Sequence, residues 1–192
     1  MIIKSADFVR SVANPNDLVM FDLPEFAFVG RSNVGKSSLI NALTNKKKLA
    51  KASSTPGRTR LINIFRINNQ FHFIDLPGYG FAQASKSEQA KWQDLIGSYL
   101  ENSANLRRVF VLVDIRHEPS EKDKLMLSYL YTYNIPFNIV ATKADKISRG
   151  QINKQLNIIA STLGVGIGDI IVTSNQDKRG KDELLDRIEN LL

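Results

Sequence analysis

One stretch of eight residues constrains the fold of this chain more than any other. Residues 30–37 read Gly-Arg-Ser-Asn-Val-Gly-Lys-Ser and fit the pattern G-x-x-x-x-G-K-[ST], which is typical of a phosphate-binding loop. The two glycines let the backbone curl until successive N–H groups point into one concavity, and the start of the next helix favours the same anion. We expect Lys36 to reach the β- and γ-phosphates and the Ser37 hydroxyl to ligate Mg²⁺. The predicted phosphate-binding residues are Gly30, Arg31, Ser32, Asn33, Val34, Gly35, Lys36 and Ser37.

The segments on either side of this loop have the character that the motif requires. Residues 25–29 form a short apolar run suited to a buried strand, whereas Leu39, Ile40 and Leu43 recur at helical spacing. The order strand, loop, helix makes an accidental glycine-rich turn a poor explanation of the pattern.

Composition limits what else the chain can be. With 192 residues and 43% hydrophobic content, we expect one soluble domain. No apolar run approaches the ~20 residues of a membrane span, no signal peptide is visible, and cysteine is absent. These features favour a cytoplasmic protein with no membrane partner. The net charge of +7 favours a polyanionic partner. The cations gather in three groups: Lys46, Lys47, Lys48 and Lys51; Arg58 and Arg60; and Lys178, Arg179 and Lys181.

The apolar pattern predicts strands alternating with helices. Candidate strands cover 25–30, 61–67, 71–76, 108–114, 136–142 and 168–173. Only three residues separate the second from the third, so this pair is expected to be antiparallel. Helices are predicted between the others, two of them beginning with the capping boxes Ser85-x-x-Glu88 and Ser120-x-x-Asp123. We expect an α/β fold: a mixed, mostly parallel six-stranded sheet with one antiparallel edge strand, helices on both faces, and residues 1–24 as an extension packed on a domain at 25–192.

Ligands bind beyond the carboxyl ends of the strands in such a sheet, so the loops there should complete the site. The third strand ends in Asp75-Leu76-Pro77-Gly78, a D-x-x-G sequence. The Asp75 carboxylate can hold the water shell of Mg²⁺, and the N–H of Gly78 can approach a γ-phosphate because no side chain blocks it.

Two further strand ends carry residues suited to a guanine base. The fifth strand ends in Thr142-Lys143-Ala144-Asp145, where one carboxylate can accept from both N1–H and N2–H₂ of guanine. Lys143 can lay its alkyl stem across the base plane. The sixth strand ends in Thr173-Ser174-Asn175, whose backbone N–H groups can reach the guanine O6.

The loop before the second strand has the composition of a switch segment. Residues 53–60 contain Ser, Pro and Gly, and both Thr55 and Thr59 qualify as ligands that join Mg²⁺ only when a γ-phosphate is present. We favour Thr59, because it adjoins the strand and Gly57 gives the loop room to close.

These motifs together resemble the EngB family, also called YihA or YsxC, of bacterial ribosome-biogenesis GTPases within the translation-factor class of P-loop GTPases. The matching stretches are GRSNVGKSSLINAL, TPGRTRLINIF, FHFIDLPGYGFA, VDIRHEPS and TKADKI. The resemblance implies a single GTPase domain, binding of GTP and GDP, Mg²⁺ and slow hydrolysis. It also implies a role in assembly of the large ribosomal subunit, and so in growth and cell division, with that subunit or its precursor as the partner of a monomeric protein.

The resemblance also assigns roles to positions. It places Ser37 and Thr59 on Mg²⁺, and makes Gly57, Arg58, Thr59, Arg60 and Leu61 the first switch and residues 75–78 the second. It places residues 142–145 and 173–175 around the base. The catalytic candidates are Lys36, Thr59, Gly78 and Asn33.

Three positions depart from the wider GTPase pattern. Thr142 stands where asparagine is usual, and Asn175 follows Ser174 where serine or alanine is more common. Tyr79 occupies the place of the glutamine that orients the attacking water in many GTPases. Asn33 resembles its counterpart in potassium-activated members of the class, so K⁺ is a candidate second ion; the alternative is that Asn33 only shapes the loop.

Two other functions stay open: a nucleotide-gated module that binds RNA or protein, and a GTPase serving tRNA modification or another assembly step.

Overall fold

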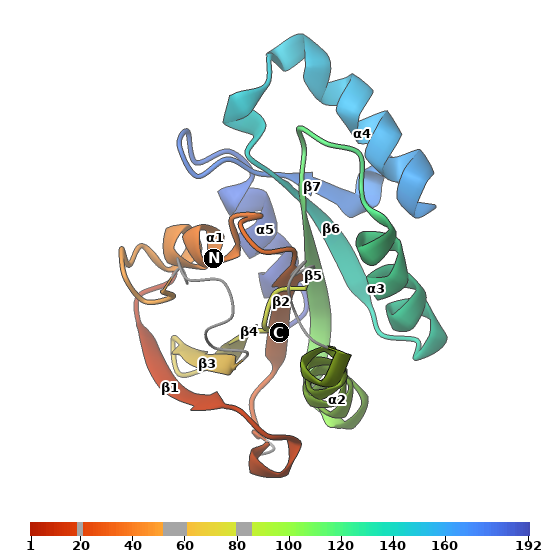
Figure 1. The fold of residues 1–192 in the computed structure, drawn as a ribbon. Coiled ribbons are helices and arrows are strands. Elements are labelled where there is room, and N and C mark those ends of the chain that lie inside the picture. Colours follow the sequence, from red (N-terminus) through yellow and green to blue (C-terminus); the bar gives the residue numbers. More distant parts are fainter. Residues whose placement is uncertain (19–20, 52–60, 80–85) are drawn as a thin grey trace.

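The computed structural model describes residues 1–18, 21–51, 61–79 and 86–192, and Figure 1 shows their arrangement. The strands are β1 (Ala6–Val12), β2 (Glu25–Gly30), β3 (Ile62–Ile67), β4 (Phe71–Asp75), β5 (Leu106–Asp114), β6 (Phe137–Thr142) and β7 (Ile170–Val172). The α-helices are α1 (Lys36–Thr44), α2 (Lys86–Asn102), α3 (Glu121–Thr132), α4 (Arg149–Leu163) and α5 (Lys181–Glu189).

The seven strands form one sheet in the order β1-β3-β4-β2-β5-β6-β7. Pairing is parallel from β4 through β7, and β3 runs antiparallel to both of its neighbours. The mostly parallel α/β architecture is confirmed, but two details of the prediction are wrong. The sheet has seven strands rather than six, and the antiparallel strand is not the edge, because β1 from the N-terminal segment pairs outside it.

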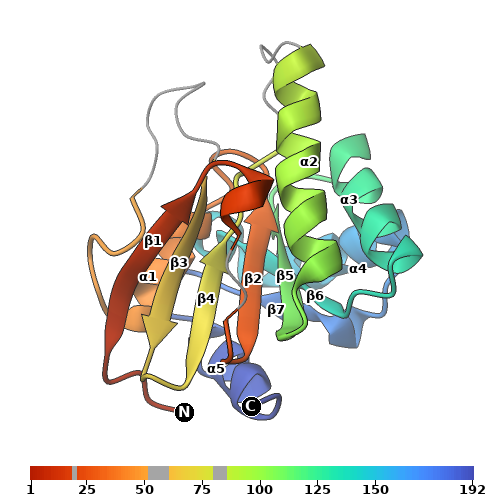
Figure 2. The ribbon, with the colours of Figure 1, turned by 90° about the horizontal axis from the view of Figure 1, so that it is seen from below.

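Helices cover both faces of the sheet (Figure 2). On one face, α2, α3 and α4 pack over the sheet through one apolar cluster, which includes Leu95, Leu130 and Ile159. On the other face, α1 and α5 share a second cluster, in which the ring of Phe28 lies 5.0 Å from that of Phe73 and 5.3 Å from that of Phe110. Because the central strands are buried on both faces, they read as continuous apolar runs, and this is why the sequence locates them well.

Local sequence sets where the helices begin. α3 begins after Ser120 with the predicted capping box to Asp123, and α4 begins after Ser148 with a second box to Gln151. Ser85, the expected cap of α2, lies outside the described residues. Within the described part of the chain, no helix is long and apolar enough to cross a membrane. The parallel strands present their carboxyl ends at one edge of the sheet, and the loops that follow these strands lie there.

Candidate nucleotide-binding site

The phosphate loop joins the last residue of β2 to the first residue of α1. Its backbone curls through positive φ values at Asn33 (63°) and Gly35 (106°), and the N–H of Val34 donates to the Arg31 carbonyl at 3.2 Å. Alternation of right- and left-handed conformations turns consecutive N–H groups to one side, which forms an anion-binding concavity. The helix that follows adds its N-terminus to this concavity.

Lys36 forms an ion pair with Asp75, the last residue of β4. Both side chains are largely buried, and Asn63 on β3 donates to the other carboxylate oxygen of Asp75 at 3.4 Å. A buried lysine and a buried carboxylate need partners, and here each provides one for the other. The structure therefore brings the cation of the phosphate loop and the carboxylate of the D-x-x-G sequence together, 39 residues apart in the chain.

The D-x-x-G segment continues along the phosphate loop. Leu76 and Pro77 follow β4, and the N–H of Leu76 donates to the Phe28 carbonyl at 3.0 Å. A Cβ atom on Gly78 would lie 3.1 Å from the Gly30 carbonyl oxygen, so a side chain would crowd the loop. The N–H of Tyr79 then donates to that same carbonyl at 3.2 Å. The absence of a side chain at Gly78 thus permits its close approach to the phosphate loop, and its contact with a γ-phosphate stays a prediction.

The segment at residues 142–145 is tied to the phosphate loop by two side chains. The buried Thr142 hydroxyl lies 2.7 Å from the Val34 carbonyl oxygen, and Lys143 Nζ donates to the Asn33 carbonyl at 2.7 Å. Thr142, which stands where asparagine is usual, therefore holds the backbone of the phosphate loop through a buried hydrogen bond. The expected position of the Lys143 stem across a base stays a prediction.

Asp145 is the carboxylate predicted to read the base. Its Oδ1 accepts from the Ser174 hydroxyl at 3.0 Å, and Oδ2 lies 3.2 Å from Lys146 Nζ. Partial burial acts to raise the pKa of Asp145, but the hydrogen bonds from Lys146 and Ser174 outweigh it and lower the pKa. The group is therefore an ionised acceptor at neutral pH, as recognition of two N–H donors requires.

The loop after β7 lies beside Asp145. The N–H of Ala144 donates to the Thr173 carbonyl at 3.1 Å, and the Ser174 hydroxyl accepts from the N–H groups of Gln176 and Asp177 at 3.3 Å. Thr173 and Ser174 are buried, whereas Asn175 is exposed. Sequence reasoning placed these residues beside the base for their backbone N–H groups, and the structure brings them next to Asp145.

Four predicted residues, Gly57, Arg58, Thr59 and Arg60, lie outside the described part of the chain. Leu61 precedes β3 directly and is half-buried. Because β3 is antiparallel, its first residues lie at the same sheet edge as Asp75, which pairs with Asn63.

The oxygen donors at this edge suit a Mg²⁺ ion that is bound together with a phosphate. Mg²⁺ prefers oxygen ligands and takes one or two protein groups together with substrate phosphates. Among the described residues, the Ser37 hydroxyl has only a long contact of 3.4 Å to the Lys51 carbonyl, and the Asp75 carboxylate stands beside Lys36. A phosphate that attracts Lys36 would free Asp75 for the water shell of the ion.

Sequence reasoning missed Asp114, the last residue of β5. Its Oδ2 lies 2.8 Å from Lys143 Nζ, and Arg116 donates to both of its oxygens, at 2.9 and 2.7 Å. Partial burial acts to raise the pKa of Asp114, but the hydrogen bonds from Arg116 and Lys143 lower it far below its usual range. The signal was present, because Asp114 ends a parallel strand at the same edge as the other loops.

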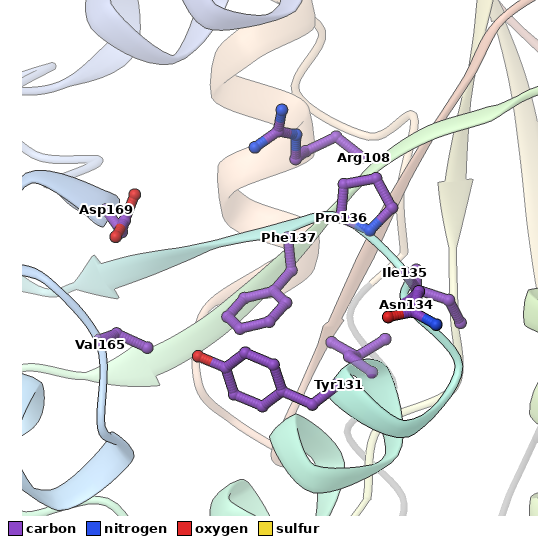
Figure 3. A pocket seen from close by; sticks show the side chains of 9 residues that line it. Arg108, Tyr131, Asn134, Ile135, Pro136, Phe137, Val165 and Asp169 are labelled. Atoms are coloured by element: carbon purple, nitrogen blue, oxygen red, sulfur yellow. The ribbon is translucent and has the colours of Figure 1, made fainter.

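A separate open pocket lies at the opposite edge of the sheet (Figure 3). Arg108 near the start of β5, Phe137 at the start of β6 and Asp169 just before β7 line it, together with Tyr131. Because these positions are at the amino ends of the strands, the pocket is remote from the phosphate loop.

Comparison with known proteins now places the chain in a family. The model of a family described as 50S ribosome-binding GTPase matches residues 25–143. The sequence is 51% identical to a Clostridium kluyveri protein named probable GTP-binding protein EngB, with 100% of this chain and 98% of that protein aligned. The protein of the same name from Desulfosudis oleivorans is 47% identical, with 100% and 97% aligned.

Solved structures agree with the sequence relatives. The crystal structure of a probable GTP-binding protein engB superposes with a TM-score of 0.70 at 28% identity, covering 87% of this chain and 97% of that one. Aquifex aeolicus Era bound to GDP and AlF₄⁻ superposes with a TM-score of 0.67 at 26% identity, covering 90% of this chain and 57% of Era. Fold, motif placement and full-length similarity agree, and we conclude that the chain is a GTP-binding P-loop GTPase that belongs to the EngB family.

Proposed function

We propose that this GTPase is Mg²⁺-dependent and slow, and that its GTP-bound form binds the large ribosomal subunit or its precursor during assembly. The description of the matching family, a 50S ribosome-binding GTPase, supports the choice of partner. The names of the sequence relatives speak only of GTP binding.

The observation that carries the nucleotide part of the proposal is the direct link between the base motif and the phosphate loop. Thr142 and Lys143 both bond to carbonyls of that loop, so the segment that carries Asp145 is tied to the phosphate loop. In the proposed complex, Lys36 leaves Asp75 for the β- and γ-phosphates. Ser37 ligates Mg²⁺ together with Thr59, which lies outside the described residues.

The proposed slow rate follows from the residue after the D-x-x-G sequence. Tyr79 takes the place of a water-orienting glutamine, and its side chain is 6% exposed. Its hydroxyl points inward to Asp123 at 2.7 Å rather than toward the phosphate loop. Burial and the neighbouring charge of Asp123 raise the pKa of Tyr79 well above its usual value, so it is no base at neutral pH. Positioning and charge at Lys36, Gly78 and Mg²⁺ are left to stabilise the transition state.

Two basic clusters that are remote in sequence meet on one surface, and this supports a polyanionic partner. Lys181 Nζ, at the start of α5, donates to the Ala42 carbonyl and to Asn45 Oδ1 at the end of α1, both at 2.6 Å. This contact places residues 46–48 next to the start of α5. Lys47, Lys48 and Lys178 are exposed there, so the surface can meet RNA phosphates.

Co-sedimentation with purified ribosomal subunits across a salt series tests the proposed partner. We expect binding to the large subunit that is stronger with a non-hydrolysable GTP analogue than with GDP. The double variant Lys47→Ala/Lys48→Ala should lower the salt slope by about one unit for each RNA phosphate that these lysines neutralise in the wild-type complex. Lys122→Ala/Lys154→Ala, exposed lysines on α3 and α4, is the matched control and should keep the slope. Binding indifferent to nucleotide and salt, or preference for the small subunit, contradicts the proposal.

A nucleotide-gated binding module remains the second candidate, and the inward position of Tyr79 favours it. In that case hydrolysis is incidental to binding. GTP turnover measured with and without large subunits separates the two: strong stimulation supports the assembly GTPase, and an unchanged rate supports the module.

A further inference from the structure

Tyr79 connects the D-x-x-G segment to a second part of the molecule. Its ring lies in the apolar cluster under α2, α3 and α4, and its hydroxyl is 2.7 Å from Asp123 Oδ1. Asp123 is the third residue of α3 and is 2% exposed. Since Tyr79 keeps its proton, the hydroxyl is the donor and the carboxylate the acceptor.

The Asp123 carboxylate holds two elements at once. While Oδ1 accepts from Tyr79, Oδ2 accepts from the Ser120 N–H at 2.7 Å and from the Ser120 hydroxyl at 2.6 Å, and so caps α3. α3 is itself fixed to α2, because the Tyr129 hydroxyl donates to Glu101 at 2.6 Å. Asp123 therefore links Tyr79 to the start of α3.

The backbone of Tyr79 is held on its other side by the phosphate loop. Its N–H donates to the Gly30 carbonyl at 3.2 Å, and its carbonyl accepts from the Ser32 N–H at 3.3 Å. Gly78 comes directly before it and approaches the same carbonyl of Gly30. The Gly78 peptide is thus confined between the phosphate loop and the residue that Asp123 holds.

We propose that Asp123 is a positioning residue for GTP hydrolysis, which acts through the Tyr79 hydroxyl to fix the Gly78 N–H where a γ-phosphate would meet it. The inference rests on the proposed role of Gly78. Because GDP has no γ-phosphate, the Tyr79–Asp123 bond matters for turnover and not for binding of GDP.

The variant Tyr79→Phe removes the hydroxyl and keeps the buried ring. We expect kcat to fall about tenfold, within the ~10²-fold that a misplacement of about 1 Å can cost. GDP affinity should stay within about twofold of wild type, because GDP has no γ-phosphate for the Gly78 N–H to meet. Asp123→Ala should lower kcat by the same factor. The double variant should be no slower than either single one, as expected for two residues that act as a unit.

Two further variants separate positioning from structural support. Asp123→Asn retains an oxygen for Ser120 and offers its amide hydrogens to the Tyr79 oxygen, so it should restore kcat to within about threefold of wild type. Ser120→Ala weakens the cap of α3 but leaves the Tyr79–Asp123 bond, and it should leave kcat unchanged. If Asp123→Ala fails to fold, Tyr79→Phe and Asp123→Asn still carry the test.

The outcomes are distinct. A wild-type kcat in Tyr79→Phe overturns the inference, and so does a loss of GDP affinity equal to the loss in kcat. Gly78→Ala tests the site on which the inference rests. If Gly78→Ala abolishes turnover and Tyr79→Phe does not, only the role of Asp123 is wrong; if Gly78→Ala turns over normally, the proposed γ-phosphate contact is wrong as well.

Discussion

At the scale of single residues, Asp145 makes the sharpest prediction. Its carboxylate is ionised and oriented by Ser174, so it can accept from N1–H and N2–H₂ of guanine. Asp145→Asn should weaken GTP binding by up to about 10⁴-fold, as for sites built to hydrogen-bond one ligand, and favour xanthosine triphosphate. Titration of both nucleotides against wild type and Asp145→Asn measures this change of nucleotide preference.

Asp182→Asn is a suitable control for the Asp145→Asn substitution, since Asp182 is an exposed carboxylate in the first turn of α5. It should bind GTP as wild type does. An unchanged preference for GTP in Asp145→Asn would remove this residue from the base site.

Asn33 provides a second residue-scale prediction. Its side chain is exposed on the phosphate loop, where its oxygen can help to hold a monovalent cation against the phosphates. We expect K⁺ to accelerate hydrolysis several-fold over Na⁺ by adding positive charge where the transition state is negative. The variant Asn33→Gly tolerates φ of 63° but lacks the oxygen, so it should lose the preference for K⁺. Equal rates in the two salts at matched ionic strength would leave Asn33 with a loop-shaping role alone.

Sequence reveals those residues of the site whose signals are local. Lys36, Asp75 and Asp145 lie in short motifs whose spacing reflects local backbone geometry. The strand end at Asp114 and the capping box at Asp123 are local signals, but the pairs that these residues form with Lys143 and Tyr79 span 29 and 44 residues, and no local spacing encodes such pairs.

At the scale of elements, the same reasoning explains why β1 was missed. The buried strands show unbroken apolar runs, whereas β1 is half-exposed and its pairing with β3 is irregular between Phe8 and Arg10. An irregularity of this kind breaks the alternation of period two that identifies an edge strand. Phe8 is 55% exposed despite being aromatic, so apolar residues here do not mark the buried face.

The loop between β7 and α5 makes the element-scale prediction. Gly180 precedes α5 with φ of 70°, and a Cβ atom there would lie 2.0 Å from the Val172 carbonyl oxygen. Gly164 after α4 has nearly the same φ, 67°, with nothing within 4 Å of its Cβ position. Gly164→Ala should therefore lower the free energy of unfolding by about 1 kcal/mol, and Gly180→Ala by about 2–5 kcal/mol.

Urea unfolding of the two alanine variants measures this difference. Gly180→Ala should also weaken GTP binding, because the same loop carries Thr173 and Ser174 beside Asp145. Equal destabilisation by the two substitutions would show that the crowding at Val172 is relieved without cost.

At the scale of the whole molecule, two buried titratable groups change stability with pH in opposite directions. Burial lowers the pKa of His72 below 6.5, and the charge of Arg66 lowers it further. The unfolded chain therefore binds this proton more readily, and stability falls as the pH drops below about 6.5. Glu25 acts in the opposite direction: burial raises its pKa above 4.5 despite hydrogen bonds from Tyr99 and Ser103, so its destabilising effect fades as the pH falls through that raised value.

The variant His72→Phe isolates the histidine contribution. Phenylalanine can keep the ring contact with Phe21, whose centroid lies 4.5 Å from that of His72, and it has no proton to bind. The free energy of unfolding of wild type relative to His72→Phe should fall between pH 7 and pH 5. A difference that is constant across this range would show that His72 binds its proton equally in both states.

The bonds from Thr142 and Lys143 to the phosphate loop have a consequence for the thermodynamics of ligand binding. They join the phosphate loop to the segment predicted to bind the base, so folding sets the spacing between the two segments. Loops that order only around a ligand lose conformational entropy at the moment of association, and that loss weakens affinity. Here the hydrogen bonds of Thr142 and Lys143 already join the two segments, so we expect a guanine nucleotide to lose little affinity to the ordering of one relative to the other.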